Sequence, residues 1–125
     1  MTEKIDEMME LRKNPRANVT WRGAIKLSDG EIIAVKIVNI ASDGLLLHCP
    51  TALEVNQQYK IMMEMPSIDQ SSSVRHQAPC KVLAMHIRLS GDFYQVGVRF
   101  TEISDLHQAL FDAWLSITAK FDQLS

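Results

Sequence analysis

The chain has 125 residues, of which 46% are hydrophobic, and its formal net charge is −2. This length and composition suit one globular domain with its own hydrophobic core. The small negative charge argues against a long nucleic acid as the partner, because proteins that bind polyanions carry broad positive surfaces. No run of 18 apolar residues predicts a membrane-spanning helix, and the first residues lack the basic and apolar regions of a secretory signal. We therefore expect a cytoplasmic protein without membrane insertion.

The first ten residues carry Ile5, Met8 and Met9 at helical spacing. A helix this short is marginal alone, since an isolated helix needs about 12–15 residues. We expect residues 1–10 to be a frayed tail or a short helix that orders against the rest of the protein.

A basic segment follows. Residues 11–28 contain five basic residues and no acidic one, which leaves eight basic against 15 acidic residues elsewhere. Arg12 and Arg16 are four apart, but Pro15 forces Asn14 out of the α region, so a loop is predicted rather than one helix face. An arginine fork matches phosphate oxygens or the O6/N7 edge of guanine. This local charge on an otherwise acidic chain favours a small anionic partner.

The middle of the chain predicts short β-strands separated by turns. Ser28-Asp29-Gly30 and Ser90-Gly91-Asp92 are turn sequences of β-hairpins, because their residues tolerate positive φ. Ala41–Gly44 is a further break, and Ser67–Ser73 is a serine-rich loop. The predicted strands are Ala17–Leu27, Glu31–Ile40, Leu45–Cys49, Gln58–Met65, Ala78–Leu89 and Phe93–Thr101. Strands at this spacing indicate a small antiparallel barrel or sandwich.

The last part of the chain predicts an amphipathic helix over residues 104–124, with Ser104 as its N-cap. Its apolar residues are spaced by three or four positions: Leu106, Leu110, Trp114, Ile117, Phe121 and Leu124. We expect this stripe to close one end of the barrel. The alternative is a homodimer formed through this helix, to which the last turns would contribute.

Catalytic and metal-binding patterns are missing from the sequence. It has no glycine-rich phosphate loop and no nucleophile elbow, and its histidines do not have the spacing of metal ligands. Cys49 and Cys80 stand apart, so we expect two reduced core thiols. His48 and Cys49 would point to opposite faces of one strand, so we do not expect them to bind a metal ion together. No enzyme activity and no cofactor are therefore expected.

Two motifs, in this order, resemble those of the PilZ domain family. Arg12 and Arg16 match its Arg-x-x-x-Arg motif, and Asn39, Ala41 and Gly44 match its Asp/Asn-x-Ser-x-x-Gly motif after the second strand. The resemblance continues in Gly44-Leu45-Leu46-Leu47, in the last strand at Gly97-Val98-Arg99-Phe100 and in the terminal helix. It covers residues 11–120 and implies a six-stranded antiparallel β-barrel with a C-terminal α-helix, formed by residues 11–125.

The resemblance implies a receptor for cyclic di-GMP, a bacterial second messenger. Arg12 and Arg16, with Lys13 beside them, would wrap the ligand and contact its phosphates and guanines. Asn39 would accept a hydrogen bond from a guanine amino group. Gly44 would let the backbone turn with positive φ and approach the ligand.

The second motif departs from the family pattern at two positions. Asn39 is neutral, so its hydrogen bond should be weaker than that of a carboxylate. Ala41 replaces the usual serine, and the lost neutral hydrogen bond is worth about 0.5–1.5 kcal/mol. Ser42 is a candidate for supplying the missing hydroxyl, although its side chain should point elsewhere. Leu11 flanks the first motif, where it would limit room for a second ligand molecule.

We expect the loop Leu11–Arg16 to order across Asn39–Gly44 when ligand neutralises its charges, and an effector protein, as yet unidentified, to bind the changed surface. One alternative is a ligand-free PilZ-type adaptor, although such members typically lack the arginines that this chain has. The other is a small barrel that binds single-stranded nucleic acid. Against it, aromatic residues make up only 6% of the chain.

Overall fold

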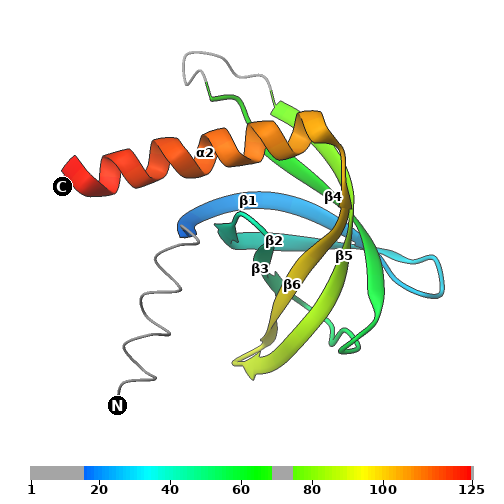
Figure 1. The fold of residues 1–125 in the computed structure, drawn as a ribbon. Coiled ribbons are helices and arrows are strands. Elements are labelled where there is room, and N and C mark those ends of the chain that lie inside the picture. The colour runs from blue at the N-terminus through cyan, green and yellow to red at the C-terminus, as the bar shows by residue number, and fades with distance from the viewer. Residues whose placement is uncertain (1–15, 69–74, 125) are drawn as a thin grey trace, which may run out of the picture.

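The computed structural model describes residues 16–68 and 75–124, with side chains up to residue 118, as a closed β-barrel and one helix (Figure 1). Residues 1–15, and with them the predicted tail and most of the first motif, lie outside the described residues, as does most of the serine-rich loop. The strands are β1 (Arg16–Lys26), β2 (Ile32–Ala41), β3 (Gly44–Cys49), β4 (Gln58–Pro66), β5 (Arg75–Ser90) and β6 (Phe93–Ile103).

The six strands follow the order β1-β2-β3-β6-β5-β4 around the barrel, and all neighbours are antiparallel. The predicted six-stranded antiparallel barrel with a C-terminal helix is therefore confirmed. β5 begins three residues before the predicted Ala78, because its pairing with β4 continues to Arg75 opposite Pro66.

Two of the predicted turns connect neighbouring strands of this barrel. At the β1–β2 turn, Gly30 has a φ of 89°, and Asp29 Oδ1 accepts a hydrogen bond from the Glu31 N–H at 2.8 Å. At the β5–β6 turn, Gly91 has a φ of 66°. Glycine adopts both conformations without the steric penalty of a Cβ atom, so these turns are fixed by local sequence.

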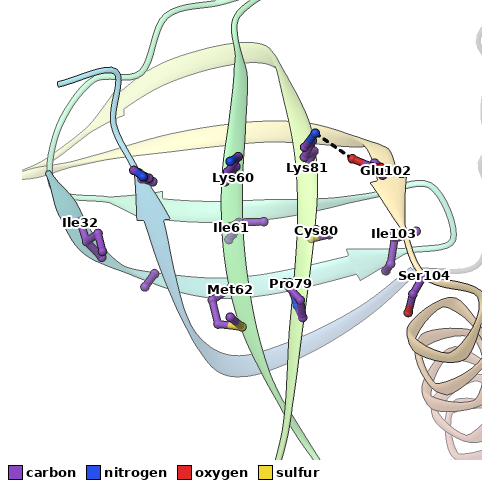
Figure 2. A pocket seen from close by; sticks show the side chains of 12 residues that line it. Ile32, Lys60, Ile61, Met62, Pro79, Cys80, Lys81, Glu102, Ile103 and Ser104 are labelled. Carbon is purple, nitrogen blue, oxygen red and sulfur yellow. Dashed lines mark ion pairs between the residues drawn. The ribbon is translucent and has the colours of Figure 1, made fainter. Parts of the chain in front are cut away.

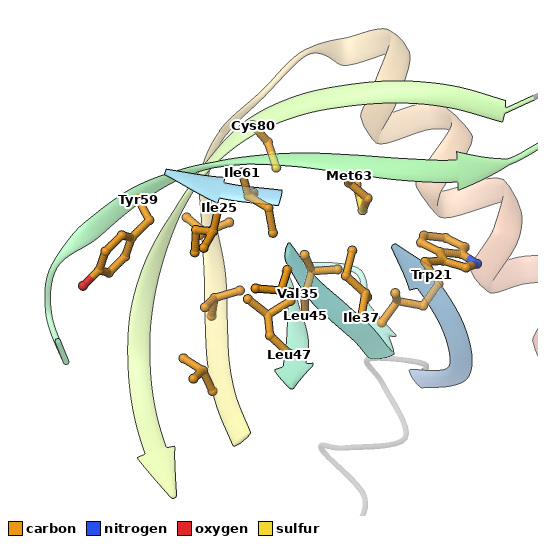
Figure 3. Close-up of a cluster of buried hydrophobic side chains, with 14 of the residues drawn as sticks. Trp21, Ile25, Val35, Ile37, Leu45, Leu47, Tyr59, Ile61, Met63 and Cys80 are labelled. Atoms are coloured by element: carbon orange, nitrogen blue, oxygen red, sulfur yellow. The ribbon is translucent and has the colours of Figure 1, made fainter. Parts of the chain in front are cut away.

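The hydrophobic core fills the inside of the barrel (Figure 3). Alternate residues along each strand point inward, so aliphatic side chains from all six strands meet there. The fully buried ones include Ile25, Ile37, Ile40, Leu47, Met63, Met65, Val82 and Val96. Because the inward positions are apolar, the outward positions of the same strands are free to carry a polar site.

Helix α2 (Asp105–Leu124) closes one end of the barrel (Figure 1). The Ser104 hydroxyl accepts the His107 N–H at 3.2 Å, which confirms the predicted N-cap. Phe111 is fully buried, and its ring makes T-shaped contacts with Trp21 at 6.1 Å and Phe100 at 5.2 Å. The expectation that the helix covers the barrel is borne out by these contacts.

The predicted apolar stripe of α2 is only partly correct. Leu106 is 67% exposed, and Leu110 is only half-buried, whereas the buried residues are Phe111 and Leu115. The aromatic contacts of Phe111 set the rotation of the helix, and these contacts involve strands that are distant in sequence. Phe121 and Leu124, which the dimer alternative also involves, have side chains outside the described part.

Both cysteines are free and buried, as expected for core thiols. Burial raises the pKa of Cys80 to about 12 and also raises the pKa of Cys49. The thiolate is the reactive form, so neither thiol is activated for chemistry in the folded protein.

Candidate functional site

A groove of about 630 Å³ lies on the outside of the barrel, around the β2–β3 turn; we call it the β2–β3 groove. It is lined by Arg16, Asn39, Ala41, Asp43, Gly44, Leu45, Leu46, Met85, His86, Arg88, Gln95, Gly97, Val98 and Arg99. The structure thus brings four of the predicted site residues together at one place. Leu11, Arg12 and Lys13 lie outside the described residues.

Four of these residues form a single cross-strand row, which we call the arginine row. Arg16 pairs with Ala41, Ala41 with Gly44, and Gly44 with Arg99. Directly opposite residues share one face of a sheet, so the row places an exposed arginine on either side of two small residues. Three strand spacings separate the two arginines, or about 14 Å. The row forms a low floor between two guanidinium groups.

The position of Arg16 corrects one prediction. The sequence placed it on a loop, but it is the first residue of β1 and pairs with Ala41. Ala17 is buried and pairs with Ile40, which holds the beginning of the strand against β2. The backbone of Arg16 is therefore fixed by sheet pairing, and only its side chain has to find a ligand.

Asn39 faces outward because β2 contains a bulge. The β2–β3 register shifts between Ile37 and Asn39, and a second shift follows Asn18 in the β1–β2 pair. Asn39 and Ala41 consequently flank the buried Ile40 and share the outer face. Bulges of this kind are frequent beside functional sites, where they redirect a side chain.

The amide of Asn39 is held in place across the sheet. Its Nδ2 donates a hydrogen bond to Asn18 Oδ1 at 2.9 Å. One of the two N–H donors of the amide is thereby used within the protein, and Oδ1 is the atom with which Asn39 would accept a bond from a ligand.

Gly44 is required for a different reason from the one predicted. The described glycines with positive φ are Gly30 and Gly91, so the prediction of positive φ at Gly44 is wrong. Ser42 and Asp43 form the turn, and Gly44 is the first residue of β3. A Cβ atom at Gly44 would lie 2.1 Å from the Val98 carbonyl oxygen. Glycine here allows β3 and β6 to pair closely at the edge of the groove.

Ser42 does not line the β2–β3 groove. It lines a neighbouring hollow, and its carbonyl oxygen accepts a hydrogen bond from Gln108 Nε2 of α2 at 3.2 Å. The expectation that its side chain points away from the ligand stays a prediction.

The far wall of the groove consists of residues from β5 and β6, which the sequence motifs do not include. A Cβ atom at Gly97 would lie 2.2 Å from His86 Nε2, so the imidazole ring of His86 covers this glycine. Arg88 donates a hydrogen bond to Gln95 Oε1 at 2.6 Å. Strand alternation could have identified Arg99 as outward-facing, since Val98 beside it is buried.

The lining of the groove is electropositive although the chain is acidic overall. Its described charged residues are three arginines and one carboxylate, that of Asp43. Such a surface can bind an anion through charge-assisted hydrogen bonds. No group of three or more potential metal-binding side chains occurs within residues 16–68 and 75–118. In the part of the chain that the structure covers, no helix is long and apolar enough to cross a membrane.

Several solved structures share this fold. Solved structures that share it include the Bacillus subtilis inhibitor of motility MotI/DgrA, with a TM-score of 0.73 and 14% identity over 87% of this chain and 52% of that chain. The PilZ domain of Escherichia coli YcgR with c-di-GMP has a TM-score of 0.63 and 12% identity over 90% and 94% of the two chains. The K. pneumonia MrkH–c-di-GMP complex has a TM-score of 0.64 and 14% identity over 91% and 55%.

These TM-scores show a shared fold, and the chain spans about half the length of the MotI and MrkH chains. A search of curated protein sequences found no match. The family model for the PilZ domain matches residues 10–116, which is most of the chain. The protein therefore belongs to the PilZ domain family.

Proposed function

We propose that this protein is a cytoplasmic bacterial receptor for cyclic di-GMP, and that the ligand lies in the β2–β3 groove. The observation that carries the proposal is the arginine row, in which Arg16 and Arg99 flank Ala41 and Gly44. Two members of the family with this fold, YcgR and MrkH, have been solved with c-di-GMP. A dianionic dinucleotide with two flat bases suits a small floor between two guanidinium groups.

Each predicted residue has a chemical role in this proposal. Arg12, Lys13 and Arg16 neutralise the phosphates, and the arginine forks also contact guanine edges or stack on the bases. Asn39 Oδ1 accepts from a guanine amino group, and the bond from its Nδ2 to Asn18 orients the amide for this. Ala41 supplies a surface without a hydroxyl, which lowers affinity without abolishing binding.

In this proposal the first motif transmits the binding of ligand to an effector protein. Residues 11–15 would order across Asn39–Gly44 when the ligand neutralises their clustered charge, and an effector protein would bind the resulting surface. Residues 11–125 act as one ligand-binding unit in this scheme, and residues 1–10 as a separate segment. The protein needs no catalytic group for this role.

Calorimetric titration of cyclic di-GMP into the wild type and the Arg16→Ala variant tests the proposal. The matched control is Arg22→Ala, an exposed arginine of the same strand that does not line the groove. We expect binding to the wild type and the control and loss of binding in Arg16→Ala, with GTP giving no comparable heat. Absence of heat with the wild type would instead indicate the ligand-free adaptor.

A further inference from the structure

A second groove of about 580 Å³ lies on the outer face of β1, β4, β5 and the end of β6, and we call it the lysine groove (Figure 2). It shares no lining residue with the β2–β3 groove. Ala24 pairs with Met62, and Met62 pairs with Pro79, which makes an apolar row across three strands. Ile32, at the margin of the groove, is 68% exposed, and Met62 is 40% exposed. These exposed side chains give the hollow an apolar floor that a partner could cover.

A row of lysines runs beside the apolar row, two residues away from it on each strand. Lys26 pairs with Lys60, and Lys60 pairs with Lys81, so three ammonium groups stand on adjacent strands in register. Lys81 forms an ion pair with Glu102 at 3.0 Å (Figure 2). No described carboxylate forms an ion pair with Lys26 or Lys60. Like charges directly opposite each other destabilise a sheet, and an anionic partner would relieve this repulsion.

The two rows together define the chemistry of the partner. A segment that fits must carry acidic groups beside apolar side chains, within the length of a few residues. A nucleic acid would supply charge without the aliphatic contacts. A flat bilayer surface would not enter a hollow between strands. An acidic, amphipathic peptide segment satisfies both rows.

The chain itself has such a segment in its sequence, at residues 1–10. These ten residues include four acidic residues and one basic residue. Their apolar residues are Met1, Ile5, Met8 and Met9. We propose that residues 1–10 of one copy dock in the lysine groove of a second copy, with the acidic groups on Lys26 and Lys60 and the apolar side chains on the Met62–Pro79 row.

The distances along the chain favour docking between copies. The groove begins at Ala24, eight residues beyond the first residue of β1, which is about 26 Å in an extended strand. Residues 11–15 span at most about 18 Å. Within one chain, residues 11–15 would therefore end short of the groove even when fully extended. Part of residues 1–10 would then be needed to reach the groove and could not dock in it. Reciprocal docking around a two-fold axis avoids this and gives two identical contacts per dimer.

A charge-swap experiment tests this proposal without any ligand, so its outcome is independent of cyclic di-GMP binding. One variant reverses the groove (Lys26→Glu with Lys60→Glu), and the other reverses the segment (Glu3→Lys with Glu7→Lys). The matched control, Arg22→Glu with Lys36→Glu, reverses an opposed pair on the barrel exterior that lines neither groove. Sedimentation velocity at protein concentrations up to about 1 mM detects a dimer whose dissociation constant is as weak as that concentration. Circular dichroism checks that each variant is folded.

We expect the wild type and the control to dimerise, and each reversed variant to dimerise at least about tenfold more weakly. An equimolar mixture of the two reversed variants should restore the dimer, because every contact in the mixed dimer is again between opposite charges. A wild type that stays monomeric, reversed variants that associate like the wild type, or a mixture that does not recover would each overturn the proposal.

Discussion

The arginine row leads to a prediction about Arg99, a residue to which the sequence motifs assign no role. Arg99 stands opposite Gly44 and is separated from Arg16 by three strand spacings, or about 14 Å. A hydrogen bond to a charged group contributes about 1.5–3 kcal/mol, and the lower end applies to this exposed side chain. Arg99→Ala should therefore weaken cyclic di-GMP binding about tenfold. The Arg99→Lys variant keeps the charge but loses the fork of the guanidinium group. Its affinity for cyclic di-GMP should therefore lie between those of the wild type and Arg99→Ala.

Isothermal titration of the wild type, Arg99→Ala, Arg99→Lys and the control Arg22→Ala measures this effect, and thermal unfolding checks that all four are equally stable. Arg99 does not pack in the core, so its truncation should leave the unfolding midpoint unchanged. If Arg99→Ala bound the ligand as tightly as the wild type while Arg16→Ala did not bind, the ligand would not reach across the row. The groove would then be occupied only on its β1–β2 side.

Four further predictions follow from the geometry. Gly44→Ala should destabilise the fold by about 1–3 kcal/mol in urea unfolding, because its Cβ would meet the Val98 carbonyl at 2.1 Å. Ala41→Ser should tighten cyclic di-GMP binding by a few-fold to about tenfold in the same titration, because it restores the family hydroxyl; weaker binding would contradict this. Ser104→Ala should cost about 1 kcal/mol in thermal unfolding, through the lost helix cap. Burial raises the pKa of Cys80 from its ordinary 9.0 to about 12, so the unfolded thiol deprotonates first and stability should fall as pH rises above 9; Cys80→Ala should reduce this fall.

The sequence predicted those features that depend on neighbouring residues. The turns at Gly30 and Gly91 and the cap at Ser104 each result from chemistry within three or four positions of the chain. The inward alternation of the strands is similarly local, and six strands with these turns leave few arrangements besides a barrel.

Features that depend on register between distant strands were not predicted. The requirement for glycine at position 44 arises from Val98, which is more than fifty residues away and approaches only because β3 pairs with β6. The outward position of Asn39 depends on a bulge, which strand periodicity alone does not reveal. The same holds for Arg99, whose part in the groove appears only once β6 lies beside β3.

The turn between β2 and β3 connects the β2–β3 groove to the closed end of the barrel. The carbonyl of Ser42 accepts a hydrogen bond from Gln108 in α2, and the carbonyl of Asp43 accepts the Phe100 N–H at 2.9 Å. Phe100 in turn packs edge-on against Phe111, the buried centre of the helix. A ligand that contacts Ala41 and Gly44 would therefore press on a turn that is held from behind by α2 and β6. Such a support keeps the turn fixed, so we expect the ligand to meet a floor that is already formed before it binds.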